Sequence, residues 1–227
     1  MLCPQFYAGS MTSAGSLTTD VLLTGFAPFD GAEVNESWEA VRLAAPALRA
    51  EGMAVVEREL PVEFGRASTL LAEAVRELRP RLVIAVGLAA GRSALTPERV
   101  AVNIRDARIP DGAGARPIDE PVVPGGPVGY FSSLPIKAMT ASLMVEGIPA
   151  AVSQPAGTYV CNDVFYALQH LLATDPALAD SGIRGGFVHV PAADAVDVPT
   201  TARGLAAMAR VALTTDDDAA VAGGAEH

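Results

Sequence analysis

Short apolar runs alternate with amphipathic stretches along most of the chain. Apolar runs of strand length occur at residues 20–26 and 81–88, and residues 53–62 alternate as a half-buried strand does. Between them, residues 37–51 and 64–79 carry apolar side chains at helical spacing. The pattern predicts strand, helix, strand, helix and strand in succession.

The second half of the chain resumes this alternation. The predicted elements are helices at residues 134–147, 158–173 and 200–215, and strands at residues 148–154 and 184–192. Strands that alternate with helices form a parallel sheet with helices on its faces. The sequence therefore predicts the α/β class.

The middle of the chain, from Ser93 to Ser133, breaks the pattern. Residues 98–109 predict a strand or a hairpin, and residues 111–130 form a long loop rich in glycine and proline. A long loop inside a compact domain usually has a function or moves. We expect one domain over residues 19–215, a disordered extension at 1–18 and a frayed acidic tail at 216–227.

Composition narrows the class of function. The chain has 227 residues, enough for one sizeable α/β core, and a formal net charge of −10. Nucleic acid and anionic membranes need a basic surface, so we expect neither as a partner. The apolar runs are far shorter than the ~20 residues of a membrane span, and the amino-terminal residues lack the features of a secretory signal. These features predict a cytoplasmic protein.

The two cysteines, Cys3 and Cys161, are too few for a disulfide framework. Cys161 follows a small turn at the start of a predicted helix, with Thr158 as its expected N-cap and Cys161 at the third helical position. Unpaired backbone N–H groups and the helix dipole would favour the thiolate there, as a nucleophile requires. The alternative is a buried structural thiol, because Cys161 also belongs to an apolar stripe of that helix.

A nucleophilic cysteine needs a base, and the chain offers three histidines. His227 is the last residue, and His170 lies on the opposite side of the helix that carries Cys161. His189 closes a predicted strand, where sites of open α/β sheets collect, or it is a hydrogen-bonded core histidine. Spacing leaves open which carboxylate orients it. The candidates are Glu98, Asp106, Asp111, Glu120 and Asp163.

Four blocks of sequence resemble the pyroglutamyl-peptidase I family of cysteine peptidases. They are LLTGFAPFDGAEVNESWEAV, GLAAGRSALTPERVAVNIRDARIPD, GIPAAVSQPAGTYVCNDVFYAL and RGGFVHVP. The resemblance implies Cys161 as nucleophile, His189 as base and Glu98 as the third member. It also implies a three-layer α/β/α sandwich with a mixed, largely parallel sheet, no metal or organic cofactor, peptides with an N-terminal pyroglutamyl residue as substrates, and a homo-oligomer.

Pyroglutamate is a small uncharged lactam, so its site needs a tight apolar slot with a few polar partners. The resemblance implies that this slot contains Phe26, Phe29, Asn35, Tyr159 and Val160. The alternative for the two phenylalanines is core packing alone. Backbone N–H groups near the thiol are expected to hold the oxyanion. The resemblance adds Arg108, while Arg92 and Arg99 are equally consistent with surface ion pairs.

The chain departs from the commonest bacterial pattern of this family at a few positions. Leu88 and Ala90 stand in GLAAGR, where GQAGGR is frequent, and Asp30 stands in PFDG, where PFGG is frequent. If position 30 needs a positive φ, aspartate is among the more tolerant residues. These departures bear on rate and fine specificity.

Two other classes of function compete with this interpretation. A nucleoside phosphorylase has a similar architecture, but the chain contains no Gly-rich phosphate loop of standard spacing. A non-catalytic relative would use the pocket only for binding and would not need Glu98, Cys161 and His189 together. A Cys161→Ser variant separates both alternatives from a cysteine peptidase.

Overall fold

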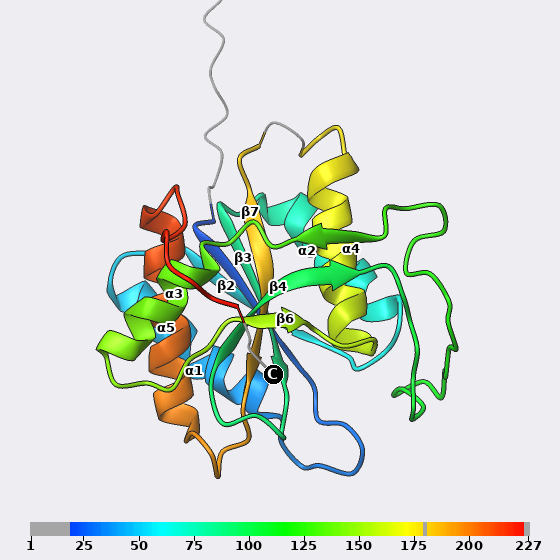
Figure 1. Cartoon of the computed structure of the whole chain (residues 1–227), viewed down its shortest axis with the longest axis horizontal. Helices are drawn as coiled ribbons and strands as arrows, with labels where there is room; N and C mark the ends of the chain where they lie inside the picture. Colours follow the sequence, from blue (N-terminus) through cyan, green and yellow to red (C-terminus); the bar gives the residue numbers. More distant parts are fainter. Residues whose placement is uncertain (1–18, 179–180, 225–227) are drawn as a thin grey trace, which may run out of the picture.

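The computed structural model describes residues 19–178 and 181–224, so the predicted extension at residues 1–18 lies outside the described residues. Five helices and seven strands occur in the described residues and form three layers (Figure 1). The strands are β1 (Val21–Phe26), β2 (Val55–Leu60), β3 (Leu82–Leu88), β4 (Thr96–Val102), β5 (Gly129–Phe131), β6 (Ser153–Pro155) and β7 (Arg184–Val190). The helices are α1 (Glu36–Ala50), α2 (Arg66–Leu78), α3 (Ile136–Val145), α4 (Val160–Thr174) and α5 (Val198–Thr214).

The sheet is mixed and largely parallel, as expected. Its strand order is β2-β1-β3-β7-β4-β5, and β6 also pairs with β4. β2, β1, β3 and β7 are parallel, whereas β4 runs antiparallel to β7. The reversal at β4 brings the start of this strand beside the carboxyl end of β7, where a site was predicted.

Two apolar cores lie on the two faces of the sheet. One joins the sheet to α1, α3 and α5, and the other joins it to α2 and α4 (Figure 1). β1 and β3 are buried along almost their whole length because helices cover both of their faces. Among the described residues, no helix has the length and apolar character needed to cross a membrane.

Most of the predicted elements form, and three segments between residues 93 and 155 differ from the prediction. The expected strand at 148–154 is reduced to β6, because Leu95 and Ala150 form only an isolated bridge before it. The strand or hairpin expected at 98–109 is β4, which begins earlier and ends at Val102. The last residues of the predicted loop form β5, an antiparallel partner of β4.

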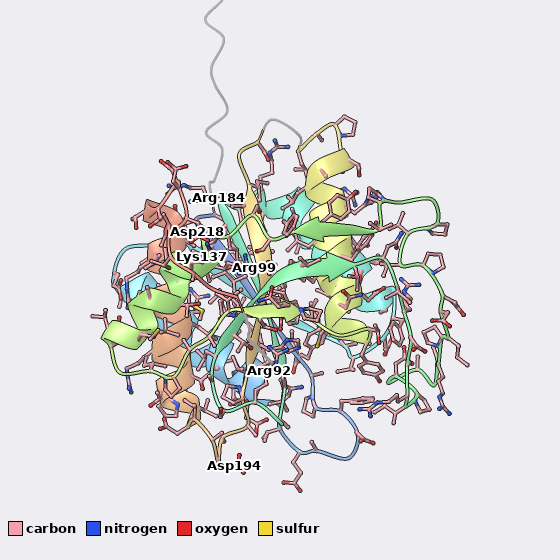
Figure 2. The ribbon with its side chains drawn as sticks, viewed as in Figure 1. Arg92, Arg99, Lys137, Arg184, Asp194 and Asp218 are labelled. Carbon is pink, nitrogen blue, oxygen red and sulfur yellow. The ribbon has the colours of Figure 1, made fainter. Side chains whose placement is uncertain are left out.

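The described part of the acidic tail, which was expected to be frayed, is hydrogen-bonded to the domain. Asp218 accepts hydrogen bonds from the backbone N–H groups of Lys137 and Ala138, at 3.0 and 2.9 Å, and so caps α3 (Figure 2). The carbonyl of Gly223 accepts a 2.7 Å hydrogen bond from Arg99 on β4. The Asp218 carboxylate thus binds the N-terminal end of a helix, where negative charge is favourable. The charge pattern of the tail alone did not indicate this contact.

Candidate active site

Cys161 is the second residue of α4. The N-cap is Tyr159 and not Thr158, so the predicted cap and the predicted third position were wrong. The Thr158 hydroxyl donates instead to the carbonyl of Asp106, at 2.7 Å. Within the described chain Tyr159 supplies no side-chain cap, so backbone N–H groups of the first turn stay available.

The sulfur of Cys161 lies directly over Gly87 of β3. A Cβ atom built at position 87 would lie 2.9 Å from Sγ of Cys161 and 2.8 Å from the ring of Phe187. Gly87 is also the register partner of His189 on the neighbouring parallel strand β7. Because register partners of parallel strands direct their side chains to the same face, the thiol and the imidazole share that face of the sheet.

His189 is fixed by a buried carboxylate on the other neighbour of β7. Its Nδ1 atom lies 2.7 Å from Oε1 of Glu98, and the Glu98 side chain has no exposed surface. Arg92 donates from Nη1 to the same Oε1 atom, at 2.7 Å. Since an ionised carboxylate only accepts hydrogen bonds, Nδ1 carries the imidazole proton and Nε2 is left as an acceptor.

Among the five carboxylates that spacing left open, Glu98 is the one that the described structure places against His189. Asp163 is instead committed to Gly65 and Ser68 near the start of α2 and to Nε of Arg105, at 2.5 Å. Asp111 accepts from backbone N–H groups, including that of Phe64 at 2.8 Å. These two carboxylates connect loops and helix ends.

The surroundings of the thiol and of the imidazole both favour the neutral form. Burial raises the pKa of the Cys161 thiol to about 12, repulsion from Glu98 adds to the rise, and Arg92 and the cysteine's own backbone N–H oppose it. Burial also lowers the pKa of His189 below its ordinary value, against the opposing effect of Glu98. The helix-start environment therefore does not make Cys161 a resting thiolate, contrary to the expectation. A neutral imidazole is the form able to take the thiol proton.

A small cavity of about 150 Å³ opens beside Cys161. The side chains around it are apolar or uncharged: Phe26, Phe29, Ala32, Val34, Asn35, Val62, Leu88, Tyr159, Val160 and Cys161. All five predicted pocket residues are among them. Phe26 serves in the core as well, since it is buried and its ring centroid lies 6.4 Å from that of Phe187. The two readings of Phe26 are thus compatible.

The polar side chains of the cavity wall are already engaged. Asn35 is the N-cap of α1. The Asn35 amide accepts from the Ser37 N–H at 3.1 Å and donates to the carbonyl of Ala27 at 3.2 Å. The Ser37 hydroxyl is buried and accepts from the N–H of Phe26 instead. The Tyr159 hydroxyl donates to the carbonyl of Pro110 at 2.9 Å.

The loop between β1 and α1 makes a left-handed turn at Asp30 and Gly31, with φ values of 55° and 78°. Position 30 therefore has the positive φ that was considered from the sequence. Arg108 lies exposed in the loop after β4, and the described cavity wall does not include it. Arg99 donates to Gln154 and to the tail, away from the thiol.

Three buried features next to the thiol were missed from the sequence. Gly87 provides room for the sulfur, and Asp163, considered from the sequence only as a partner of His189, joins α4 to α2. Asn162, directly after Cys161, is fully buried and makes three hydrogen bonds, two with Val102 at the end of β4 and one with Ile104, two residues further on. A polar dipeptide directly after the cysteine, inside an apolar stripe, is the sequence signal that could have indicated a structural role.

A thiol on the same sheet face as a neutral histidine that a buried carboxylate orients, next to a small uncharged cavity, is typical of cysteine-dependent hydrolases. Comparison with known proteins narrows the class. The family model described as pyroglutamyl peptidase matches residues 19–222, so the chain belongs to the pyroglutamyl peptidase family and is a cysteine peptidase.

Relatives and solved structures agree with this assignment. The chain is 49% identical to a pyrrolidone-carboxylate peptidase of Cupriavidus necator over 217 residues, which is 91% of this chain and 99% of that protein. It is also 49% identical to one of Streptomyces coelicolor, over 92% of this chain and 100% of that protein. The crystal structure of pyroglutamyl peptidase I from Bacillus amyloliquefaciens superposes with a TM-score of 0.82 at 40% identity, over 88% of this chain and all of that one.

Proposed function

We propose that this protein hydrolyses the amide bond that follows an N-terminal pyroglutamyl residue, through a thioester on Cys161, and releases 5-oxoproline. The observation that most supports the assignment of roles is the 2.7 Å contact between Nδ1 of His189 and buried Glu98, on the sheet face over which Sγ of Cys161 lies. Membership of the pyroglutamyl peptidase family supports the substrate class.

Catalysis begins from the neutral thiol and the neutral imidazole. Nε2 of His189 takes the proton of Cys161 as the sulfur attacks the carbonyl carbon, so the unfavourable resting thiolate is avoided. The resulting imidazolium gives its proton to the nitrogen of the leaving peptide. Glu98 stabilises the imidazolium and holds the ring in place. Water, deprotonated by His189, then hydrolyses the thioester, and the thiol is restored.

The negative oxygen of each tetrahedral intermediate is held by backbone N–H groups in the first turn of α4. Tyr159 supplies no side-chain cap in the described structure, which leaves these donors available to an oxyanion, and the helix dipole favours negative charge there. Arg108 was predicted as a further support. It lies exposed in the loop after β4, and its contribution to holding the oxyanion stays a prediction from the resemblance.

Selectivity follows from the cavity. Its walls carry no charged side chain among the described residues, and the polar groups of Asn35 and Tyr159 are hydrogen-bonded to backbone carbonyls. A neutral lactam ring fits such a wall, whereas the charged amino group of an ordinary N-terminus would be desolvated without a counter-ion. Unmodified peptides are thereby excluded.

The proposal includes a cytoplasmic location, predicted from the sequence features, and a homo-oligomer of two or four subunits, implied by the resemblance. The long connection between β4 and β5 either closes over the peptide or forms a subunit contact. Sedimentation velocity on the full chain measures the assembly state directly.

The decisive test is hydrolysis of pyroglutamyl-aminomethylcoumarin beside the prolyl and alanyl amides, with and without iodoacetamide, and with EDTA as a metal control. We expect cleavage of the pyroglutamyl amide alone, loss of activity on alkylation and no effect of EDTA. Cleavage of the prolyl amide at a comparable rate would contradict the selectivity argument.

Active-site variants test the roles. Cys161→Ser is expected to abolish turnover, and His189→Asn and Glu98→Gln to reduce it strongly. A folded Cys161→Ser protein that still cleaves the substrate would overturn the mechanism. Binding of 5-oxoproline by Cys161→Ser, measured by calorimetry, reports whether the cavity itself survives the substitution.

A further inference from the structure

Arg92 lies in the loop after β3, toward the end of the sheet at which β3 and β7 finish (Figure 2). Its Nη1 atom donates to Oε1 of Glu98 at 2.7 Å and also to the hydroxyl of Thr96. The Thr96 hydroxyl in turn donates to the carbonyl of His189, at 3.3 Å. One guanidinium is therefore connected both to the carboxylate that orients the imidazole and to the backbone of the histidine.

The two oxygen atoms of the Glu98 carboxylate have different environments. Its Oε1 atom takes both available donors, from His189 and Arg92, at 2.7 Å each. Its Oε2 atom is buried and has no hydrogen-bond partner in the described part of the chain. Removing Arg92 would leave a fully buried carboxylate with the imidazole as its single donor, which is costly for an ionised group.

We propose that Arg92 is a positioning residue of the active site, which compensates the buried charge of Glu98 and fixes Oε1 where Nδ1 of His189 can donate to it. Arg92 acts through Glu98 and does not line the cavity. This inference rests on the roles proposed above for Cys161, His189 and Glu98.

Arg92 also acts on the reacting pair by its charge. It lowers the pKa of the Cys161 thiol, in opposition to burial and to Glu98. It lowers the pKa of His189 as well, in the same direction as burial. Two charged side chains shift the pKa values of both Cys161 and His189: Glu98 on β4 and Arg92 after β3. The other titratable group that faces the thiol is the neutral Tyr159 at the start of α4. Loss of the Arg92 charge should therefore move formation of the thiolate to higher pH.

The test compares Arg92→Gln and Arg92→Lys with the wild-type chain. Arg81→Gln is the matched control, because Arg81 forms an exposed ion pair with Asp20, at 3.1 Å, at the opposite end of β3. Two readouts are measured: kcat and KM for pyroglutamyl-aminomethylcoumarin, and the pH dependence of alkylation of Cys161 by iodoacetamide, followed by mass spectrometry of the Cys161 peptide. Thermal unfolding of each variant monitors the fold.

We expect Arg92→Gln to lower kcat roughly 10- to 100-fold with KM changed less than about threefold, because the interaction serves the reaction rather than substrate binding. We also expect alkylation at about pH 8 to slow by roughly 3- to 10-fold, as a pKa shift of up to about one unit requires. Arg92→Lys should restore most of the alkylation rate, since it keeps the charge, but only part of kcat, since it lacks the planar fork.

Three results would overturn the proposal: wild-type kcat and alkylation in Arg92→Gln, a higher KM with unchanged kcat, or an equal loss in Arg81→Gln. The alkylation measurement needs no substrate. If the wild-type chain fails to cleave the pyroglutamyl amide, the proposed function fails, while the alkylation profile still decides whether Arg92 controls the thiol.

Discussion

Gly87 lies so close beneath Cys161 that a methyl group at position 87 would come within 2.9 Å of the sulfur. We expect Gly87→Ala to push the thiol or the Phe187 ring from its place. A displacement of about 1 Å at a reacting atom can cost roughly 100-fold in rate, so kcat should fall by that order. Overpacking of this kind also destabilises by about 1–3 kcal/mol, which urea unfolding measures.

Gly91→Ala is the matched control for Gly87→Ala. It makes the same chemical change in the loop after the same strand, where a Cβ atom would meet nothing within 4 Å in the described structure. Its kcat should stay within about twofold of the wild type, since surface substitutions of this kind are nearly neutral. Equal losses of kcat in the two variants would show that crowding of the thiol at position 87 is not the cause of the lower kcat of Gly87→Ala.

Cys161 and His189 could be predicted from the sequence, whereas Gly87 could not. Cys161 and His189 stand out because the chain has few cysteines and histidines, and their predicted places at a helix start and a strand end bring them to one edge of the sheet. Gly87 is one of 21 glycines. Nothing local distinguishes it, because its requirement comes from side chains of two other elements, Cys161 and Phe187, that meet above it.

Asn162 fastens the start of α4 to the end of β4. It accepts from the Val102 N–H at 3.0 Å and donates to the carbonyls of Val102 and Ile104 at 2.8 and 3.0 Å. Since β4 carries Glu98 and α4 carries Cys161, these bonds fix the spacing between the two. We expect Asn162→Ala to lower the free energy of unfolding by about 3 kcal/mol, because it leaves buried backbone groups without a hydrogen-bond partner. The same variant should lower kcat by roughly 10-fold or more.

Asn103→Ala separates stability from positioning. Asn103 also makes three side-chain hydrogen bonds, but with Val123 and Gly126 of the long loop. It should reduce stability measurably and leave kcat within about threefold, because kcat depends on the interactions made at the reaction centre. If both asparagine variants lower kcat in proportion to their lost stability, Asn162 has no special effect on the active site.

The same distinction applies to the fold: some elements could be predicted from local sequence, and others depend on distant pairing partners. Helices and buried parallel strands carry their period in the sequence, so α1, α2, α4, β1, β3 and β7 lie within two residues of their predicted bounds. β5 and β6 are three residues each and exist only because β4 pairs with them. The reversed direction of β4 is equally invisible locally, since its apolar pattern does not report which neighbour it pairs with.

The tail shows the same dependence on a distant partner. Asp218 caps α3 at Lys137 and Ala138, although Pro135, the N-cap, supplies no side-chain hydrogen bond within the described chain. We expect Asp218→Ala to lower the free energy of unfolding by about 1 kcal/mol and to expose the tail to limited proteolysis. Asp217→Ala removes the same charge from an exposed neighbour and should change neither. Equal proteolysis of the two variants would contradict the capping role.

The resting state of Cys161 leads to a prediction about pH. Its pKa is raised to about 12, chiefly by burial and then by Glu98, so the protonated thiol dominates near neutral pH and the thiolate fraction grows as pH rises. Alkylation of the native protein by iodoacetamide should therefore accelerate continuously through about pH 9, the region in which an ordinary thiol with a pKa of about 8.5 begins to level off. The rate is measured from the Cys161 peptide by mass spectrometry.

The same chain in concentrated urea serves as the reference for this measurement, because unfolding removes both the burial and the proximity of Glu98. In urea the alkylation rate of Cys161 should level off near the ordinary thiol pKa of about 8.5, so the native curve must lie at higher pH. A native curve that reaches its plateau below about pH 7 would mean a resting thiolate paired with imidazolium, as in thiols activated at helix starts. Proton transfer to His189 would then precede substrate binding, and the acid limb of kcat/KM would report the ion pair rather than neutral His189.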